Sequence, residues 1–117
     1  MTKLYKALAF DFPFDEPGRG SCFVSDRITV DGAPVGYMYR EDPDNEIDSG
    51  WRFLAGDESQ DYINNPDNLA IFEVNQIAKH DPDIVALLSA PSGSAFERTE
   101  DGHFESVPFD LRNEDLH

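Results

Sequence analysis

The chain has 117 residues, of which 39% are hydrophobic, so it is long enough for one domain with a true core and too short for two. Its 24 acidic and 9 basic residues give a formal net charge of -15. This charge argues against nucleic acid or an anionic membrane as a partner, because each phosphate contact begins with repulsion. It favours fast capture of a basic protein partner.

In residues 4–14, phenylalanines alternate with Asp11 and Pro13, a pattern typical of an edge strand. The segment does not read as a signal peptide, because Tyr5, Lys6 and Asp11 interrupt its apolar run and no small-residue cleavage site follows. No apolar run in the sequence is long enough to cross a bilayer. We therefore expect a cytoplasmic protein.

Residues 22–25 predict a short buried strand. Cys22 is the only cysteine, which excludes an internal disulfide, and its apolar neighbours favour a buried thiol over a reactive one. The Asp31-Gly32 pair is a strong turn signal. Residues 28–30 and 34–40 are therefore expected to form an extended pair, such as a hairpin.

A polar loop over residues 41–50 is followed by a strand that contains Trp51 and Phe53 and ends at Gly56. Asp57 or Ser59 can then cap a short helix, which is expected over residues 60–64.

Pro66 stops this helix, and residues 70–74 form a strand or the entry to the next helix. Residues 75–91 have apolar residues at helical spacing, interrupted by Pro82 in the first turn of a second helix that Asp81 caps.

Residues 95–98 and 103–107 flank a TEDG turn and predict a hairpin. Residues 111–117 form a polar tail. Together these elements predict a single α+β domain over residues 1–117, with a mostly antiparallel sheet of short strands and one or two helices in the second half.

The sequence contains no recognisable metal-binding or catalytic motif. Counted from Asp42, an EF-hand would need a glycine at the sixth position and a glutamate at the twelfth, where Ile47 and Phe53 stand. The histidines lack the spacing of a helical zinc site. Ser94 lacks the second glycine of a nucleophile elbow, because Phe96 occupies that place. We expect no metal, no cofactor and no catalytic residue.

Aromatic residues and arginines stand among acids between positions 37 and 67, and these residue types are common at the centres of protein interfaces. Aromatics that alternate on the faces of a sheet would give the same pattern. The candidate partner-binding surface comprises Tyr39, Arg40, Asp48, Trp51, Arg52, Asp57, Glu58, Asp61 and Tyr62.

Three segments resemble a known family: VGYMYRE (residues 35–41), DSGWRFLAGDE (residues 48–58) and GSAFER (residues 93–98). Their order is that of a family of small bacterial proteins, first catalogued as a domain of unknown function and later placed among the immunity proteins of polymorphic toxin systems as class thirty-three. The resemblance runs from about residue 22 to residue 98. It implies a protein that neutralises a bacterial toxin by binding it, and it carries no enzymatic residues with it.

Two classes of function therefore stay open. The first is an immunity-type protein that captures a basic partner, such as a toxin, through the acidic and aromatic surface. The alternative is a small-molecule-binding or enzymatic domain with a cleft around Tyr39, Trp51 and Arg52. A third hypothesis is an accessory module of a larger assembly.

Overall fold

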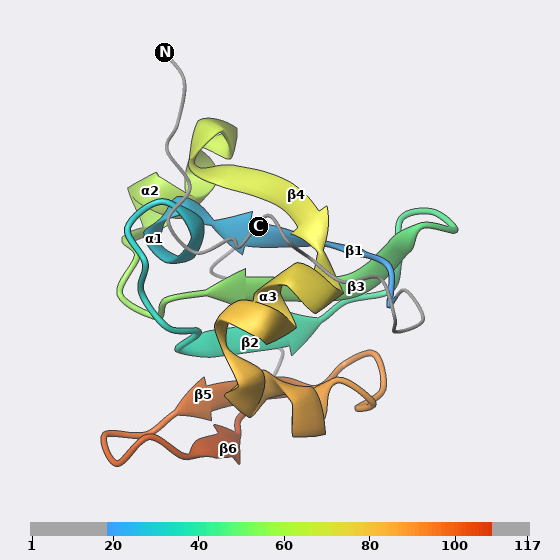
Figure 1. Ribbon diagram of the computed structural model, residues 1–117. Helices are drawn as coiled ribbons and strands as arrows, with labels where there is room; N and C mark the ends of the chain where they lie inside the picture. Colours follow the sequence, from blue (N-terminus) through green and yellow to red (C-terminus); the bar gives the residue numbers. More distant parts are fainter. Residues whose placement is uncertain (1–18, 109–117) are drawn as a thin grey trace.

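The computed structural model describes residues 19–108, which build a six-stranded sheet in the order β4-β1-β3-β2-β5-β6 (Figure 1). β1 and β3 run parallel, and all other neighbouring strands in this sheet are antiparallel. The strands are β1 (Ser21–Ser25), β2 (Tyr37–Arg40), β3 (Asp48–Leu54), β4 (Leu69–Glu73), β5 (Ala95–Arg98) and β6 (Phe104–Ser106). The predicted α+β domain with a mostly antiparallel sheet is confirmed, while residues 4–14 and 111–117 lie outside the described residues.

Within residues 19–108, five helical segments accompany the sheet. They are α1 (Asp26–Thr29), α2 (Gln60–Asn64), the 3₁₀ turn η1 (Pro66–Asn68), α3 (Val74–His80) and the 3₁₀ turn η2 (Pro82–Leu87). The Ser59 hydroxyl accepts a hydrogen bond from the Tyr62 amide at the start of α2, and the Asp81 carboxylate accepts one from the Asp83 amide at the start of η2. Both predicted helical regions and their caps are confirmed, because these local signals need no distant partner.

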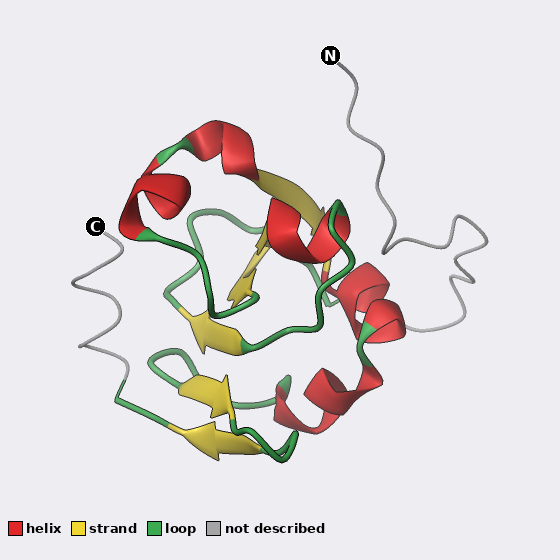
Figure 2. Ribbon diagram, turned by 90° about the vertical axis from the view of Figure 1, so that its left-hand side faces the viewer, coloured by secondary structure: helices red, strands yellow, loops and turns green. Residues whose placement is uncertain are grey.

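The main core lies where α3 and η2 cover one face of the sheet (Figures 1 and 2). Trp51 is 1% exposed there, and its indole Nε1 donates to the Leu88 carbonyl at 3.3 Å. The sheet side of this core is Cys22, Val24, Met38, Trp51 and Phe53, and the helical side is Val74, Ile77, Ile84 and Leu88. Cys22 is buried as predicted, and its burial raises the pKa of the thiol far above the usual range.

The expected hairpin of residues 28–30 and 34–40 is wrong. Residues 26–29 form α1, whose first turn Ser25 caps by accepting from the Arg27 amide. The amide of Gly32, at φ +85°, donates to the Ile28 carbonyl and closes the C-terminal end of this turn. The Asp31-Gly32 signal therefore ends a helix instead of joining two strands. β2 pairs with β3 and β5.

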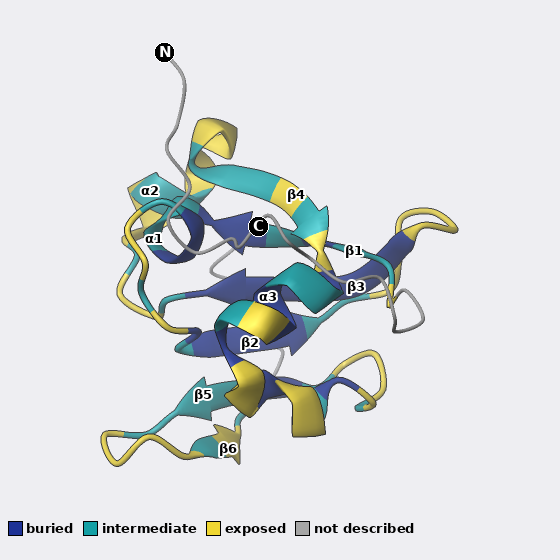
Figure 3. Cartoon of the chain, viewed as in Figure 1, coloured by how far each residue is buried: buried dark blue, intermediate teal, exposed yellow. Residues whose placement is uncertain are grey.

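The second face of the sheet carries a smaller cluster of buried side chains: Tyr37, Tyr39, Leu54 and Ala95. Three partly buried residues pack against this cluster: Ile63 of α2, Leu69 and Val107. β3 is buried along its whole length, as Figure 3 shows, while β4 at the edge is partly exposed. β3 therefore contributes buried side chains to both faces of the sheet, Trp51 and Phe53 to one and Leu54 to the other.

Candidate functional site

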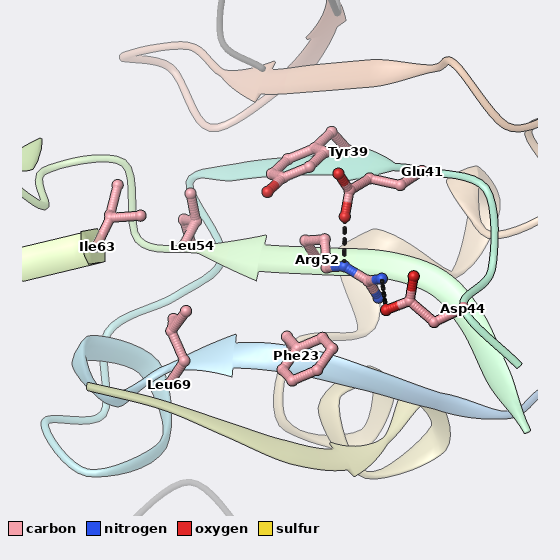
Figure 4. Close-up of a pocket in the computed structure, with 8 residues that line it drawn as sticks. All are labelled: Phe23, Tyr39, Glu41, Asp44, Arg52, Leu54, Ile63 and Leu69. Carbon is pink, nitrogen blue, oxygen red and sulfur yellow. Dashed lines mark hydrogen bonds and ion pairs between the residues drawn. The ribbon is translucent and has the colours of Figure 1, made fainter. Parts of the chain in front are cut away.

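A hollow of about 230 Å³ opens on the second face of the sheet. Figure 4 looks into it, with Arg52 lying between Tyr39 and Phe23. The lining residues come from β1, β2, the β2–β3 loop, β3, α2 and β4: Phe23, Tyr39, Glu41, Asp44, Arg52, Leu54, Ile63 and Leu69. We call this hollow the Arg52 pocket.

Strand pairing places Arg52 at the centre of the pocket. Its Cα is paired with that of Phe23 across the parallel β1–β3 contact and with that of Tyr39 across the antiparallel β2–β3 contact. Paired residues on neighbouring strands point to the same face, so the guanidinium emerges between two aromatic rings. Its carbon lies 4.8 Å from the centroid of the Phe23 ring, within the range of a cation–π contact.

The Arg52 guanidinium is almost fully enclosed and well partnered. Only 7% of the side chain is exposed. Nε donates to Glu41 Oε2 at 2.8 Å, while Nη1 and Nη2 donate to the two carboxylate oxygens of Asp48 at 2.9 Å each. Nη1 also donates to the Trp51 carbonyl at 3.0 Å, and Nη2 lies 3.9 Å from Asp44 Oδ2. This arrangement holds a buried charge with paired carboxylates.

Hydrogen bonds and burial shift the pKa values of Asp48, Arg52 and Tyr39. The hydrogen bonds from Arg52 hold the pKa of the Asp48 carboxyl well below its usual range. Burial alone would lower the pKa of Arg52, but its bonds to Asp48 and Glu41 raise that pKa above its usual range. Burial, and secondly the charge of Glu41, raise the pKa of Tyr39. At neutral pH Arg52 is therefore cationic, Asp48 is anionic and Tyr39 is a neutral phenol.

A bulge in β3 brings Asp48 to Arg52. Ser21 is paired with Asp48 and Phe23 with Arg52, so β3 advances by more residues than β1 over the same stretch. Gly50 lies within this bulge at φ +89°, and a Cβ added there would meet the Glu41 carbonyl oxygen at 2.2 Å. Glycine therefore allows the close passage of Glu41, whose carboxylate then reaches Arg52.

The structure brings three of the predicted site residues together at the Arg52 pocket. Tyr39 and Arg52 line it, and the Asp48 carboxylate accepts hydrogen bonds from Arg52. Trp51 belongs to the main core on the opposite face. Tyr39, Trp51 and Arg52 therefore do not line one cleft.

Arg40 also lies apart from the pocket. Its guanidinium lies 5.6 Å from the centroid of the Trp51 ring, and it donates to the carbonyls of Ser49 and Ala90. These contacts fasten β2 to the segment after η2.

The remaining predicted site residues lie in α2 and the turn before it. The Asp57 carboxylate pairs with the Arg27 guanidinium at 2.5 and 3.1 Å, which lowers the pKa of Asp57. Glu58 accepts hydrogen bonds from the amides of Ala55 and Gly56 at 2.7 and 2.9 Å, so its carboxylate closes the turn after β3. Asp61 is exposed and Tyr62 is half-buried, both in α2.

The pocket also contains residues that were not predicted as site residues, notably Phe23, Glu41 and Asp44. Phe23 stands between Cys22 and Val24, and strand alternation could have assigned it to the face opposite the core. Its position beside Arg52 depends on the parallel pairing of β1 with β3, which no local sequence pattern predicts.

Within residues 19–108 no group of His, Cys, Asp and Glu side chains is arranged to hold a metal ion. No helix in the same part of the chain combines the length and the apolar character that crossing a membrane requires.

The family model described as "Immunity protein Imm33 domain" matches residues 22–108. The chain belongs to the Imm33 family. The match confirms the resemblance drawn from the sequence and extends it to include the β5–β6 hairpin. Neither a search of curated proteins nor a search of solved structures gave a match.

Proposed function

We propose that this Imm33 protein neutralises a cognate bacterial toxin by binding it with the second face of the sheet, in the cytoplasm. Membership of an immunity-protein family supports a toxin as the partner. The Arg52 pocket supports the proposal of the second face, because a hollow flanked by aromatic rings and bordered by carboxylates is suited to anchor a partner residue.

Apolar residues extend this surface beyond the pocket. Ile71 is 64% exposed on β4, and its register with Phe23 places the two side chains next to each other on the second face. An exposed isoleucine beside a half-buried phenylalanine provides apolar area that a partner can cover.

The charge of the chain favours a basic toxin. A net charge of -15 accelerates the encounter with a positively charged surface and disfavours acidic competitors. The exposed acids beside the second face include Asp44 in the β2–β3 loop and Asp61 in α2. We propose that these two acids, together with Asp57 and Glu58, steer the toxin towards the pocket, and that Tyr62 contacts the bound toxin.

A small molecule is the less favoured ligand of the same pocket. Sites for drug-sized ligands typically enclose about 300–1,000 Å³, and the Arg52 pocket has about 230 Å³. Its size fits one side chain of a protein partner better.

Co-expression with a toxin identified among the neighbouring genes tests the proposal. Wild-type protein should restore growth, and Ile71→Asp should lose protection and affinity while retaining its melting temperature. Val85→Asp is the matched control, because Val85 is also an exposed apolar residue, 44% exposed, but lies in η2 on the helix-covered side. Equal effects of the two substitutions would contradict the choice of the second face, and failure of wild type to bind or protect would contradict the function.

A further inference from the structure

We propose that the Arg52 pocket receives one basic side chain of the toxin, with arginine preferred to lysine. The inference rests on the proposed function, since it names the group that the toxin presents to this site. Three observations carry it: the charge balance around Arg52, the occupation of its donors, and the shape of the walls.

The charge balance of the pocket is negative. One guanidinium, that of Arg52, forms ion pairs with the carboxylates of Glu41, Asp44 and Asp48. One positive and three negative charges sum to -2. Asp48 neutralises Arg52 in a two-point pair from the buried side, so Glu41 and Asp44 supply the excess negative charge on the side that opens to solvent.

Four of the five N–H donors of Arg52 are already hydrogen-bonded, which argues against an anion as the ligand. A guanidinium has five N–H donors. The hydrogen bonds of Arg52 reach Glu41, both oxygens of Asp48 and the Trp51 carbonyl, and the remaining N–H of Nη2 is on the group that lies 3.9 Å from Asp44 Oδ2. Glu41 and Asp44 would repel an incoming carboxylate or phosphate before it could accept a hydrogen bond from Arg52. A cationic group could instead donate hydrogen bonds to the carboxylates of Glu41 and Asp44.

The walls of the pocket suit a long side chain with a planar cationic end. Leu54, Ile63 and Leu69 form an apolar wall at the end away from Glu41 and Asp44 (Figure 4). This wall can cover the aliphatic stem of an arginine, while the rings of Phe23 and Tyr39 flank its path. The planar guanidinium stacks on aromatic rings and forms two-point pairs with carboxylates, which an ammonium group cannot do.

Asp44 provides the most informative variant. Its side chain is 74% exposed and contacts Arg52 only at 3.9 Å, so its substitution leaves the buried pair of Arg52 and Asp48 in place. Asp42 is an exposed acid of the same loop that does not line the pocket. Asp44→Lys and Asp42→Lys change the net charge by the same amount, so their comparison separates the pocket from general electrostatics.

The first experiment uses the free protein labelled with ¹⁵N and N-acetyl-arginine methylamide as the probe. We expect progressive shifts of the amides of Phe23, Arg52 and Leu54 during the titration, smaller shifts with the lysine analogue and none with the glutamate analogue. Asp44→Lys should weaken arginine binding about tenfold, as Coulomb's law gives for a reversed charge near 5 Å in water. Asp42→Lys should weaken it less than about twofold. Equal weakening by both variants, or shifts confined to other surfaces, would overturn the inference.

The second experiment measures toxin binding by the same two variants and keeps the two proposals apart. Loss of toxin affinity in Asp44→Lys, with Asp42→Lys close to wild type, supports the pocket as the toxin subsite. Wild-type toxin affinity in Asp44→Lys overturns that role and leaves the immunity function standing. Binding of the arginine probe by a protein that neither binds nor neutralises the toxin overturns the proposed function and leaves the cation preference of the pocket intact.

Discussion

Asp48 and Arg52 are joined by two parallel hydrogen bonds of 2.9 Å, although both belong to β3 and stand four positions apart. In a regular strand the Cα atoms of such residues are about 13 Å apart. The bulge around Gly50 shortens the distance between the two residues, and the long arginine side chain spans the distance that is left. One strand thus supplies both the charge at the centre of the pocket and the partner that neutralises it.

Removal of the Asp48 charge should destabilise the fold. Asp48→Asn leaves the Arg52 guanidinium enclosed and without its two-point partner, and breaking a buried pair in this way costs about 3–5 kcal/mol. Urea unfolding measures the change in the free energy of unfolding. Asp44→Asn is the control, because its exposed side chain approaches Arg52 only at 3.9 Å, and it should leave the midpoint nearly unchanged. A stable Asp48→Asn variant would mean that Glu41 alone satisfies Arg52.

The same pair predicts a loss of stability in acid. Because the pKa of Asp48 is lower in the folded chain than in the unfolded chain, where it is about 3.9, the folded state binds fewer protons. The stabilisation is therefore fully present above the unfolded pKa and is lost as the pH falls towards the folded pKa. The difference in unfolding free energy between wild type and Asp48→Asn should be constant at neutral pH and shrink between about pH 4 and pH 2. A difference that persists unchanged to pH 2 would contradict the lowered pKa.

Trp51 should act through stability and not through contact with the toxin. Trp51→Ala removes the largest side chain of the main core and its bond to the Leu88 carbonyl, which should cost about 3–5 kcal/mol. Trp51→Phe keeps much of the apolar volume and should cost less. Thermal melts and toxin titrations measure the two effects separately. Lower toxin affinity of a fully folded Trp51→Phe variant would argue for a direct role of the indole.

The acids before and within α2 should differ in what they do. Asp61→Asn and Asp57→Asn should leave the melting temperature nearly unchanged, because both carboxylates are exposed. Each should slow association with a basic toxin and reduce its salt dependence. Glu58→Ala should cost about 1 kcal/mol of stability, because the amides of Ala55 and Gly56 lose their acceptor. Stopped-flow association at two salt concentrations, with melts of each variant, separates steering from turn closure.

The elements that could be predicted from sequence are those with local signals. The Ser59 cap, Pro82 behind its Asp81 cap and the TEDG turn each mark a boundary that the structure retains. The prediction around α1 is wrong, because a glycine after an aspartate serves equally to end a helix and to join two strands.

The pocket could not be predicted from the sequence, because it depends on the pairing of strands that are distant along the chain. Arg52 meets Phe23 only because β1 lies beside β3, and it meets Tyr39 only because β2 lies on the other side. The sequence places these strands in the order β1, β2, β3, which gives no reason to expect β3 between the other two. Residue types alone identified Tyr39, Asp48 and Arg52 as candidates, but not which of their neighbours share a face with them.

The alternation of side chains along β1 and β4 also bears on how such a protein can evolve. Cys22, Val24 and Phe72 point into the main core, while Phe23, Leu69 and Ile71 point to the second face. Substitutions at the second set can alter recognition while the residues beneath the helices stay fixed, because successive side chains of a strand point to opposite faces of the sheet. A lineage could therefore follow a changing toxin by altering every other codon of these two strands, without re-inventing its fold each time.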